Sequence, residues 1–253
     1  MKLEYKKRIA VLTLTRESSL NALDASFFAD LKLVLEHLNL ANEIKALIIT
    51  GQGKGFCVGA DLKDLPIGTD LDLGKSLRDN FIPMVEGITG LPMPTIAAVN
   101  GYAAGAGMGL MLSCDFTIAA KSANFVQAFI NIGLVPDAGS TFFLPRFIGR
   151  ARANEMMMLG ENIAAEEAAS IGLIYKCVED DRLMEETMKL ADKLAKKPKS
   201  ALLQIRKLLN DSHENKFNDQ LEAEAEAQQL AGQSKNFQEG VAAFKEKRNP
   251  EFE

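Results

Sequence analysis

Residues 94–120, PTIAAVNGYAAGAGMGLMLSCDFTIAA, contain the pattern that decides the fold. The run TIAAVNG (95–101) is typical of a buried strand, and GAGMGLMLSC (105–114) opens with glycines and continues as an apolar helix. DFTIAA (115–120) then predicts another strand. Because a strand, a helix and a second strand follow in this order, the stretch favours parallel pairing through crossover helices in an α/β fold.

The same alternation continues toward the N-terminus. RIAVLTL (8–14) and IKALIITG (44–51) predict strands, and residues 24–39 predict an amphipathic helix with Asp24 as its N-cap. Between these elements and residue 94, residues 51–62 are interpreted as a glycine-rich connector and residues 64–90 as a polar stretch, helical or mobile.

Toward the C-terminus the pattern becomes helical. Residues 164–172 predict a short helix and residues 173–179 a last strand, after which Pro198 interrupts a series of helical patterns. We therefore expect a core over residues 1–195 and a C-terminal helical lobe over residues 196–253, which would cover the core or a neighbouring subunit.

Composition excludes several classes of function. The chain has 253 residues and a net charge of -5, which argues against nucleic acid as a partner. No apolar run approaches the roughly 20 residues that a membrane span needs, and the N-terminus lacks a signal-peptide cleavage site. The three cysteines are far apart without a CxxC spacing, so we expect reduced core residues in a cytoplasmic protein.

Only two histidines are present, His37 in a helical run and His213 in a polar stretch. A zinc site built from several histidines is excluded, we expect no metal, and neither context favours a Ser-His-Asp triad. Chemistry would have to rest on carboxylates and backbone amides.

Three loops are rich in turn residues. In the first, Gly55 and Gly59 flank a hydrophobic plug before Ala60 and Asp61. The second is the glycine cluster at 101–109, where neither the dinucleotide spacing nor a P-loop occurs. Tight packing and an anion site at a helix N-terminus remain equally open there.

The third loop is NIGLVPDAGSTFFLPR (131–146), where Asp137 stands between Pro136 and Ala138. Pro, Asp and Gly are typical turn formers. On local chemistry alone, Asp137 is either a residue that shapes the turn or the acid/base of an enzyme.

Taken in order, FCVGADL (56–62), residues 94–120 and FVQAFINIGLVPDAGSTFFLPRFIG (125–149) resemble the crotonase (enoyl-CoA hydratase/isomerase) superfamily. The likeness runs from SLNALD (19–24) to EGVAAFKEKRNPEF (239–252). It implies a crotonase (ClpP-like) spiral of ββα units with a C-terminal helical lobe, an acyl-CoA substrate without a further cofactor, and a homotrimer or a hexamer made of two trimers.

The resemblance also implies site residues. The amides of Ala60 and Ala106 would form an oxyanion hole for the thioester carbonyl. Hydratases of the family use two glutamates, and at those positions this chain has Gly109 and Phe129. Ordinary hydration therefore lacks its acid/base pair.

Asp137 is then the candidate acid/base, as in the phenylacetate-pathway isomerases that act on 2-(1,2-epoxy-1,2-dihydrophenyl)acetyl-CoA, some of which also shift double bonds in enoyl-CoAs. An apolar pocket would raise its pKa. The residues proposed for that pocket, each of which could equally be core, are Met84, Phe125, Phe129 and Phe142.

The resemblance places coenzyme A across residues 19–23 and 60–63, with Arg16 or Lys63 at the phosphates and Lys247 reaching a neighbour's ligand. The expected substrate-binding residues are Arg16, Ala22, Ala60, Asp61, Leu62, Lys63, Ala106, Phe129 and Lys247. Two alternatives stay open: an enoyl-CoA hydratase, and a non-catalytic acyl-CoA-binding relative in which Asp61, Asp64 and Asp137 are only surface and turn residues.

Overall fold

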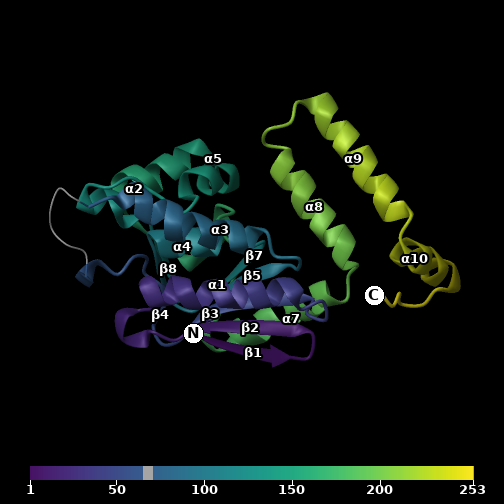
Figure 1. Ribbon diagram of the computed structural model, residues 1–253, viewed down its shortest axis with the longest axis horizontal. Coiled ribbons are helices and arrows are strands. Elements are labelled where there is room, and N and C mark those ends of the chain that lie inside the picture. Colours follow the sequence, from purple (N-terminus) through teal and green to yellow (C-terminus); the bar gives the residue numbers. More distant parts are fainter. Residues whose placement is uncertain (65–70, 253) are drawn as a thin grey trace.

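Two β-sheets form the centre of the molecule in a computed structural model that describes residues 1–64 and 71–252 (Figure 1). The larger sheet has the order β1-β2-β3-β5-β7-β10, and the smaller has the order β4-β6-β8-β9. The strands of the larger sheet are β1 (Lys2–Lys6), β2 (Ile9–Leu14), β3 (Ala46–Gly51), β5 (Thr95–Val99), β7 (Phe116–Ala120) and β10 (Lys176–Val178). Those of the smaller sheet are β4 (Gly55–Cys57), β6 (Tyr102–Ala104), β8 (Asn124–Val126) and β9 (Asn162–Ala164).

The predicted parallel pairing is confirmed for the five strands from β2 to β10. The prediction is incomplete at two edges, because it did not include β1 and β9, which pair antiparallel with β2 and β8. The interpretation of residues 51–62 as a connector is also wrong in part, since this segment contains β4. The smaller sheet was not predicted because its strands have three residues each, too few for a periodic pattern.

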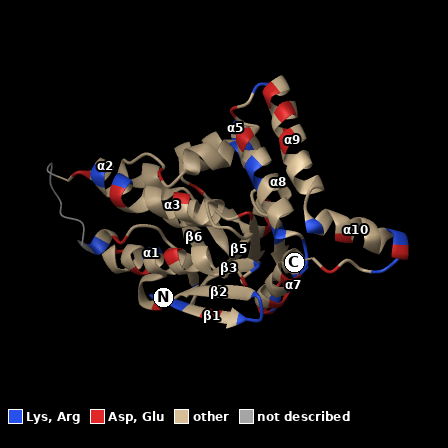
Figure 2. Cartoon of the chain, turned by 45° about the vertical axis from the view of Figure 1, so that its right-hand side comes forward, with Lys and Arg blue, Asp and Glu red and all other residues tan. Residues whose placement is uncertain are grey.

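The central strands are buried on both faces. Leu47 and Ile49 of β3 face the cluster that includes the helices α1 (Ala25–Leu40), α3 (Ile82–Thr89) and α4 (Ala106–Leu112). Ile48, between them, faces the opposite cluster with α7 (Leu183–Ala195). Burial on both sides explains why β3, β5 and β7 contain no charged residues (Figure 2).

Local signals account for several helix boundaries. Asp24 caps α1 as predicted, its carboxylate accepting a hydrogen bond from the Phe27 amide at 2.8 Å. The described part of residues 64–90 is helical, while residues 65–70 lie outside the described residues. Its elements are η2 (Leu62–Asp64), α2 (Leu73–Ser76), a π-helical turn η3 (Leu77–Phe81) and α3. Helix α5 (Ser140–Leu159), kinked at Gly149, was not predicted, and it precedes α6 (Ala165–Ser170).

Three helices project from the core beyond Pro198: α8 (Lys199–Asp211), α9 (Phe217–Gly232) and α10 (Lys235–Glu246) (Figure 1). The predicted α/β class with a C-terminal helical run is confirmed, whereas the division at residues 195 and 196 stays a prediction. Among the described residues, no helix combines the length and the apolar character needed to cross a membrane.

Candidate active site

Helix α4 begins beside the smaller sheet. Its N-cap is Gly105, whose φ of 51° favours glycine and whose N–H donates to the carbonyl of Val126 at 3.0 Å. Ala106 is the first helical residue, so its N–H has no acceptor within the helix. This amide is a free donor at the positive end of a helix dipole.

Ala60 is oriented by a parallel bridge to Leu23. Leu23 donates to the Gly59 carbonyl at 2.8 Å and accepts from the Asp61 amide at 2.9 Å, so the N–H of Ala60 points to the opposite side. Gly59, with φ of 87°, lies so close to α4 that a Cβ on it would be 3.1 Å from the Ala106 nitrogen. The two predicted oxyanion amides therefore belong to adjoining loops.

The other glycines of this region serve close backbone packing. A Cβ at Gly101 would lie 2.0 Å from the Lys54 carbonyl oxygen, and one at Gly107 would lie 2.0 Å from that of Cys57. At Gly109 the obstacle is Ala138, whose Cβ would be 2.4 Å away. For these three glycines the structure supports tight packing, which the sequence had left equal to an anion site.

Asp137 lies on a turn that rests on α4. Ala138 and Gly139 have positive φ values of 48° and 77°, and the Ser140 amide donates to the Asp137 carbonyl at 2.9 Å. Since Ala138 touches Gly109, the turn is seated on α4 one helical turn beyond Ala106. The predicted acid/base and one of the predicted oxyanion amides thus lie on two elements in direct contact.

The Asp137 carboxyl lies in a poorly solvated environment. Its Oδ1 is buried and has no hydrogen-bond partner among the described residues. Burial raises the pKa of Asp137 to about 6. Such a group is ionised at neutral pH yet basic enough to accept a proton, which suits a general acid/base.

The apolar residues expected around Asp137 separate into three environments. Phe129 lies over the α4 N-cap, 3.5 Å from where a Gly105 Cβ would be. Phe125 and Met84 are core residues with 0% and 2% exposure. The expectation for Phe142 is wrong, because its ring lies under the Arg146 guanidinium at 3.6 Å and lines a cleft of about 410 Å³ beside α8.

The residues expected to bind coenzyme A include a paired cation. Arg16 donates to the carboxylate of Asp61 at 2.9 Å, lies 3.1 Å from Asp24 and also donates to the Ala22 carbonyl. The Arg16 guanidinium holds the pKa of Asp61 below its usual range. Lys63 and Leu62 are exposed, and the Lys63 amide donates to Asp61 at 3.2 Å. Lys63 therefore has the freer charge for a phosphate.

Lys247 lies apart from these residues. It is exposed, adopts a left-handed conformation with φ of 54° and ends α10, which packs against α9 far from α4 (Figure 1). Within one chain it does not join the site.

Sequence reasoning missed two buried amides that connect these loops. Asn21, in left-handed conformation, donates to the carbonyls of Gly55 and Gln52 at 2.8 and 3.1 Å. Gln127 donates to the Ser140 hydroxyl at 3.1 Å. Polar residues inside otherwise apolar motifs, LNAL and FVQAF, were the available signal.

Other features of the described residues point to no second reaction centre. His37 pairs with the Tyr5 hydroxyl at 2.7 Å on the surface, and His213 lies in an exposed turn. Within residues 1–64 and 71–252, no group of three or more histidine, cysteine, aspartate or glutamate residues is arranged to hold a metal ion.

Comparison with known proteins agrees with the geometry. The model of the family described as enoyl-CoA hydratase/isomerase matches residues 4–253. A 1,2-epoxyphenylacetyl-CoA isomerase of Escherichia coli is 42% identical, with 98% of this chain and 95% of the relative covered. A probable enoyl-CoA hydratase of Rhodobacter capsulatus is 43% identical, with 98% and 96% covered.

The solved structures agree in fold. An enoyl-CoA hydratase from Bacillus anthracis superposes with a TM-score of 0.92 at 32% identity, covering 99% of this chain and 98% of the other. The expected crotonase architecture and the likeness to phenylacetate-pathway isomerases are confirmed. The chain belongs to the enoyl-CoA hydratase/isomerase family, the crotonase superfamily.

Proposed function

We propose that this protein is a CoA-thioester isomerase in which Asp137 moves the proton and the amides of Ala60 and Ala106 hold the thioester oxygen. The observation that carries the proposal is the Asp137 carboxyl itself, with a buried, unpartnered oxygen and a pKa raised to about 6 beside α4. Because no described residue hydrogen-bonds to this oxygen, the carboxyl has no competing structural role there.

In the proposed reaction, the Asp137 carboxylate removes a proton from a carbon next to the thioester carbonyl. The electron pair moves to the carbonyl oxygen, where two backbone N–H groups stabilise the enolate by about 3–4 kcal/mol each. Asp137 then returns the proton to a different carbon. One carboxylate is sufficient because the product has the same atoms as the substrate.

The packing around Gly109 argues against the hydratase alternative. A glutamate there would place its Cβ 2.4 Å from the Ala138 Cβ and 2.5 Å from the Ala138 carbonyl oxygen. Phe129, at the other glutamate position, is apolar and 8% exposed. The Asp137 turn thus fills space that a carboxylate on α4 would need.

The likeness to 1,2-epoxyphenylacetyl-CoA isomerase supports 2-(1,2-epoxy-1,2-dihydrophenyl)acetyl-CoA as the substrate, with enoyl-CoA double-bond isomerisation as a second activity. Lys63 would meet the phosphates, while Arg16, tied to Asp61 and Ala22, would shape the loop around the nucleotide. The thioester is the substrate, and no further cofactor is needed.

The test is Asp137→Asn, assayed with the ring-epoxide, a 3-enoyl-CoA and crotonyl-CoA by absorbance and mass. We expect binding within a few-fold of wild type and a loss of turnover of at least about 100-fold. Asp192→Asn, an exposed aspartate on α7, is the matched control and should keep full activity. Near wild-type turnover in Asp137→Asn contradicts the assignment.

The substrate panel separates the alternatives. Rapid formation of 3-hydroxyacyl-CoA from crotonyl-CoA would favour the hydratase. Tight binding of thioesters with no conversion would favour a non-catalytic acyl-CoA-binding protein.

We also propose a homotrimer, or a hexamer of two trimers, in the cytoplasm. Large apolar side chains stand exposed on the lobe, among them Phe217 at 76% and Phe244 at 84%. Free Cys57 and Cys114 are buried, which suits a reducing compartment. Light scattering should give a mass of three or six chains, and Phe244→Asp should lower it; a wild-type monomer would contradict the assembly.

A further inference from the structure

Gln127 occupies an unusual position for a polar residue. It is 0% exposed, it follows the last residue of β8, and its Oε1 is buried without a hydrogen-bond partner among the described residues. A buried amide that is only half satisfied costs stability, so an apolar residue would be the cheaper choice for the fold.

The contacts of Gln127 reach both parts of the candidate site. Its side-chain N–H donates to the hydroxyl of Ser140, also 0% exposed, at 3.1 Å. Ser140 in turn donates its backbone N–H to the Asp137 carbonyl at 2.9 Å. On the other side, the residue before Gln127 is Val126, whose carbonyl accepts from the α4 N-cap Gly105 at 3.0 Å.

We propose that Gln127 is a positioning residue that, through Ser140, fixes Asp137 relative to the amide of Ala106. The inference rests on the proposed isomerase function. Gly105 and Ala106 are joined to the end of β8, Gln127 leaves that same strand end, and Ser140 closes the connection to the Asp137 turn. Proton transfer and enolate stabilisation need these groups at one fixed separation, and a misplacement of about 1 Å can cost on the order of 100-fold in rate.

The charged groups near the Asp137 turn do not replace the hydrogen bond between Gln127 and Ser140. Helix α4 and the segment η4 (Ala128–Ile132) contain no ionisable residue. Glu86 of α3 and Arg146 of α5, from the other elements packed near the turn, are exposed to solvent. Within residues 1–64 and 71–252, therefore, no ion pair holds Asp137 in place, and the buried amide–hydroxyl contact takes that role.

The experiment uses Gln127→Met, Ser140→Ala and the double variant in the full-length protein. We expect each single variant to lower kcat by about 10- to 100-fold, with KM and the Kd of an unreactive acyl-CoA within about 2-fold. The double variant should be no slower than the worse single variant, because one contact is lost in all three. Its thermal midpoint should return to the wild-type value or above, since both polar partners are then gone.

The pH profile gives a signature that a merely structural role would not move. A loosened turn lets water reach the carboxyl, so the acid limb of kcat/KM should move by about 1 pH unit below the wild-type limb near 6. Thr187→Val is the control, because it removes a fully buried hydroxyl on α7, remote from the site. It should lower the thermal midpoint and leave kcat and the pH profile unchanged.

The outcomes separate the two proposals. Wild-type kcat and pH profile in both single variants, with Asp137→Asn inactive, would overturn the positioning role alone. The positioning role would also be overturned if the fold-losses in kcat of the two single variants multiply in the double variant. A loss of kcat that follows the loss of thermal stability across the three variants would overturn it too. Near wild-type turnover in Asp137→Asn would overturn the isomerase proposal and this inference together.

Discussion

The region around α4 and the C-terminal lobe are packed in opposite ways. All seven residues of α4 are buried, and its glycines touch the backbone of neighbouring loops. In the lobe, α8 has no buried residue, α9 has only Ala227 and α10 only Ala243. Charged residues of both signs lie along the lobe (Figure 2), and large apolar side chains such as Phe217, Phe237 and Phe244 are exposed there. The α4 region is thus densely packed within one chain, whereas the lobe leaves large apolar side chains uncovered.

The largest effect should come from adding one carbon on the core side of this comparison. Gly109→Ala would push its Cβ against Ala138, so we expect a loss of about 3 kcal/mol or more in the free energy of unfolding, measured by urea denaturation. Gly232→Ala, in the open at the end of α9, should change it by less than about 1 kcal/mol, in the stabilising direction. Equal changes in the free energy of unfolding in the two variants would contradict the difference in packing between α4 and the lobe.

The next effect concerns the link between core and lobe. Arg206 of α8 donates to Asp115 and to the carbonyls of Thr89, Leu91 and Met93 at 2.5–3.2 Å. Arg206→Ala should lower the free energy of unfolding by about 2–3 kcal/mol, because Asp115 keeps its hydrogen bonds from Thr95 but loses its ion-pair partner. Limited proteolysis should then release the lobe first. Lys207→Ala, which removes an exposed pair on the same helix, is the control; equal protease sensitivity in both would contradict the link.

A smaller effect, of opposite sign, should follow from removing the Asp137 charge. The pKa of Asp137 in the folded protein, about 6, lies above the usual aspartate value of 3.8, so the carboxyl destabilises the folded state increasingly as pH rises from about 4 to 6, and fully above 6. Asp137→Asn should gain about 1–2 kcal/mol at pH 8, after allowance for partial exposure, and the gain should vanish at pH 4. A gain that is independent of pH would contradict the buried carboxylate.

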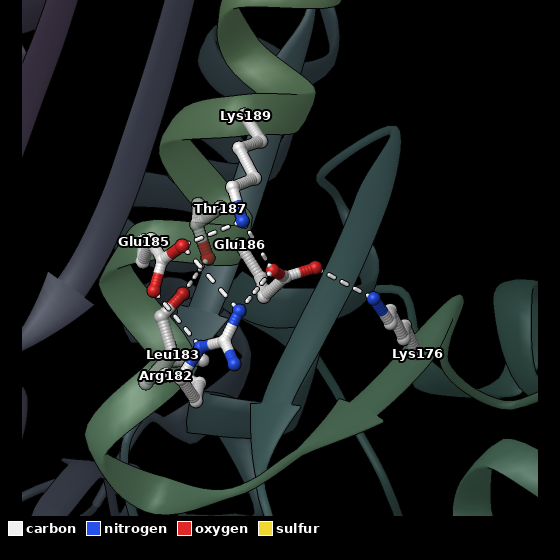
Figure 3. A network of polar contacts seen from close by, with 7 residues as sticks. All are labelled: Lys176, Arg182, Leu183, Glu185, Glu186, Thr187 and Lys189. Atoms are coloured by element: carbon white, nitrogen blue, oxygen red, sulfur yellow. Dashed lines mark hydrogen bonds and ion pairs between the residues drawn. The ribbon is translucent and has the colours of Figure 1, made fainter.

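The smallest effect should come from the exposed charge network at the start of α7 (Figure 3). Glu186 meets Lys176 at 2.7 Å and both Arg182 and Lys189 near 3 Å, and Lys176 is the main cause that lowers its pKa to about 2. The contribution of Glu186 to stability is present above the usual glutamate pKa of 4.5 and is lost as pH falls toward 2. Arg182→Ala should shift the thermal midpoint by less than about 2 °C at pH 7. A larger shift of the thermal midpoint would contradict the small contribution expected of these exposed ion pairs.

How much of the fold was predictable depended on element length. The five- and six-residue strands β2, β3, β5 and β7 were visible because each is a mostly apolar run without a charged residue. The edge strand β1 was not visible because its sequence, KLEYK, is charged and mostly exposed. The three-residue strands of the smaller sheet were not visible because each is short and pairs with a strand at least about 20 residues away. Helix α5 was hidden by Pro145 and Gly149, which break the helical pattern in its sequence.

The candidate site was likewise predictable only in part. Asp137 and the amides of Ala60 and Ala106 were found through family motifs, and their roles stay predictions. The pairing of Arg16 with Asp61 joins residues 45 positions apart, so no local pattern could reveal that this cation is already occupied. The contact of Gln127 with Ser140 depends on the path of the chain between these two residues, which no local sequence pattern predicts.

The contact between Gly109 and Ala138 has a consequence for redesign. A carboxylate on α4 and the present Asp137 turn compete for one volume, so the two acid/base arrangements exclude each other. We expect glutamates introduced at positions 109 and 129 alone to give neither hydratase activity nor the proposed isomerase activity. We infer that an exchange between the two would have to include the turn from Gly133 to Ser140, and therefore a change of backbone.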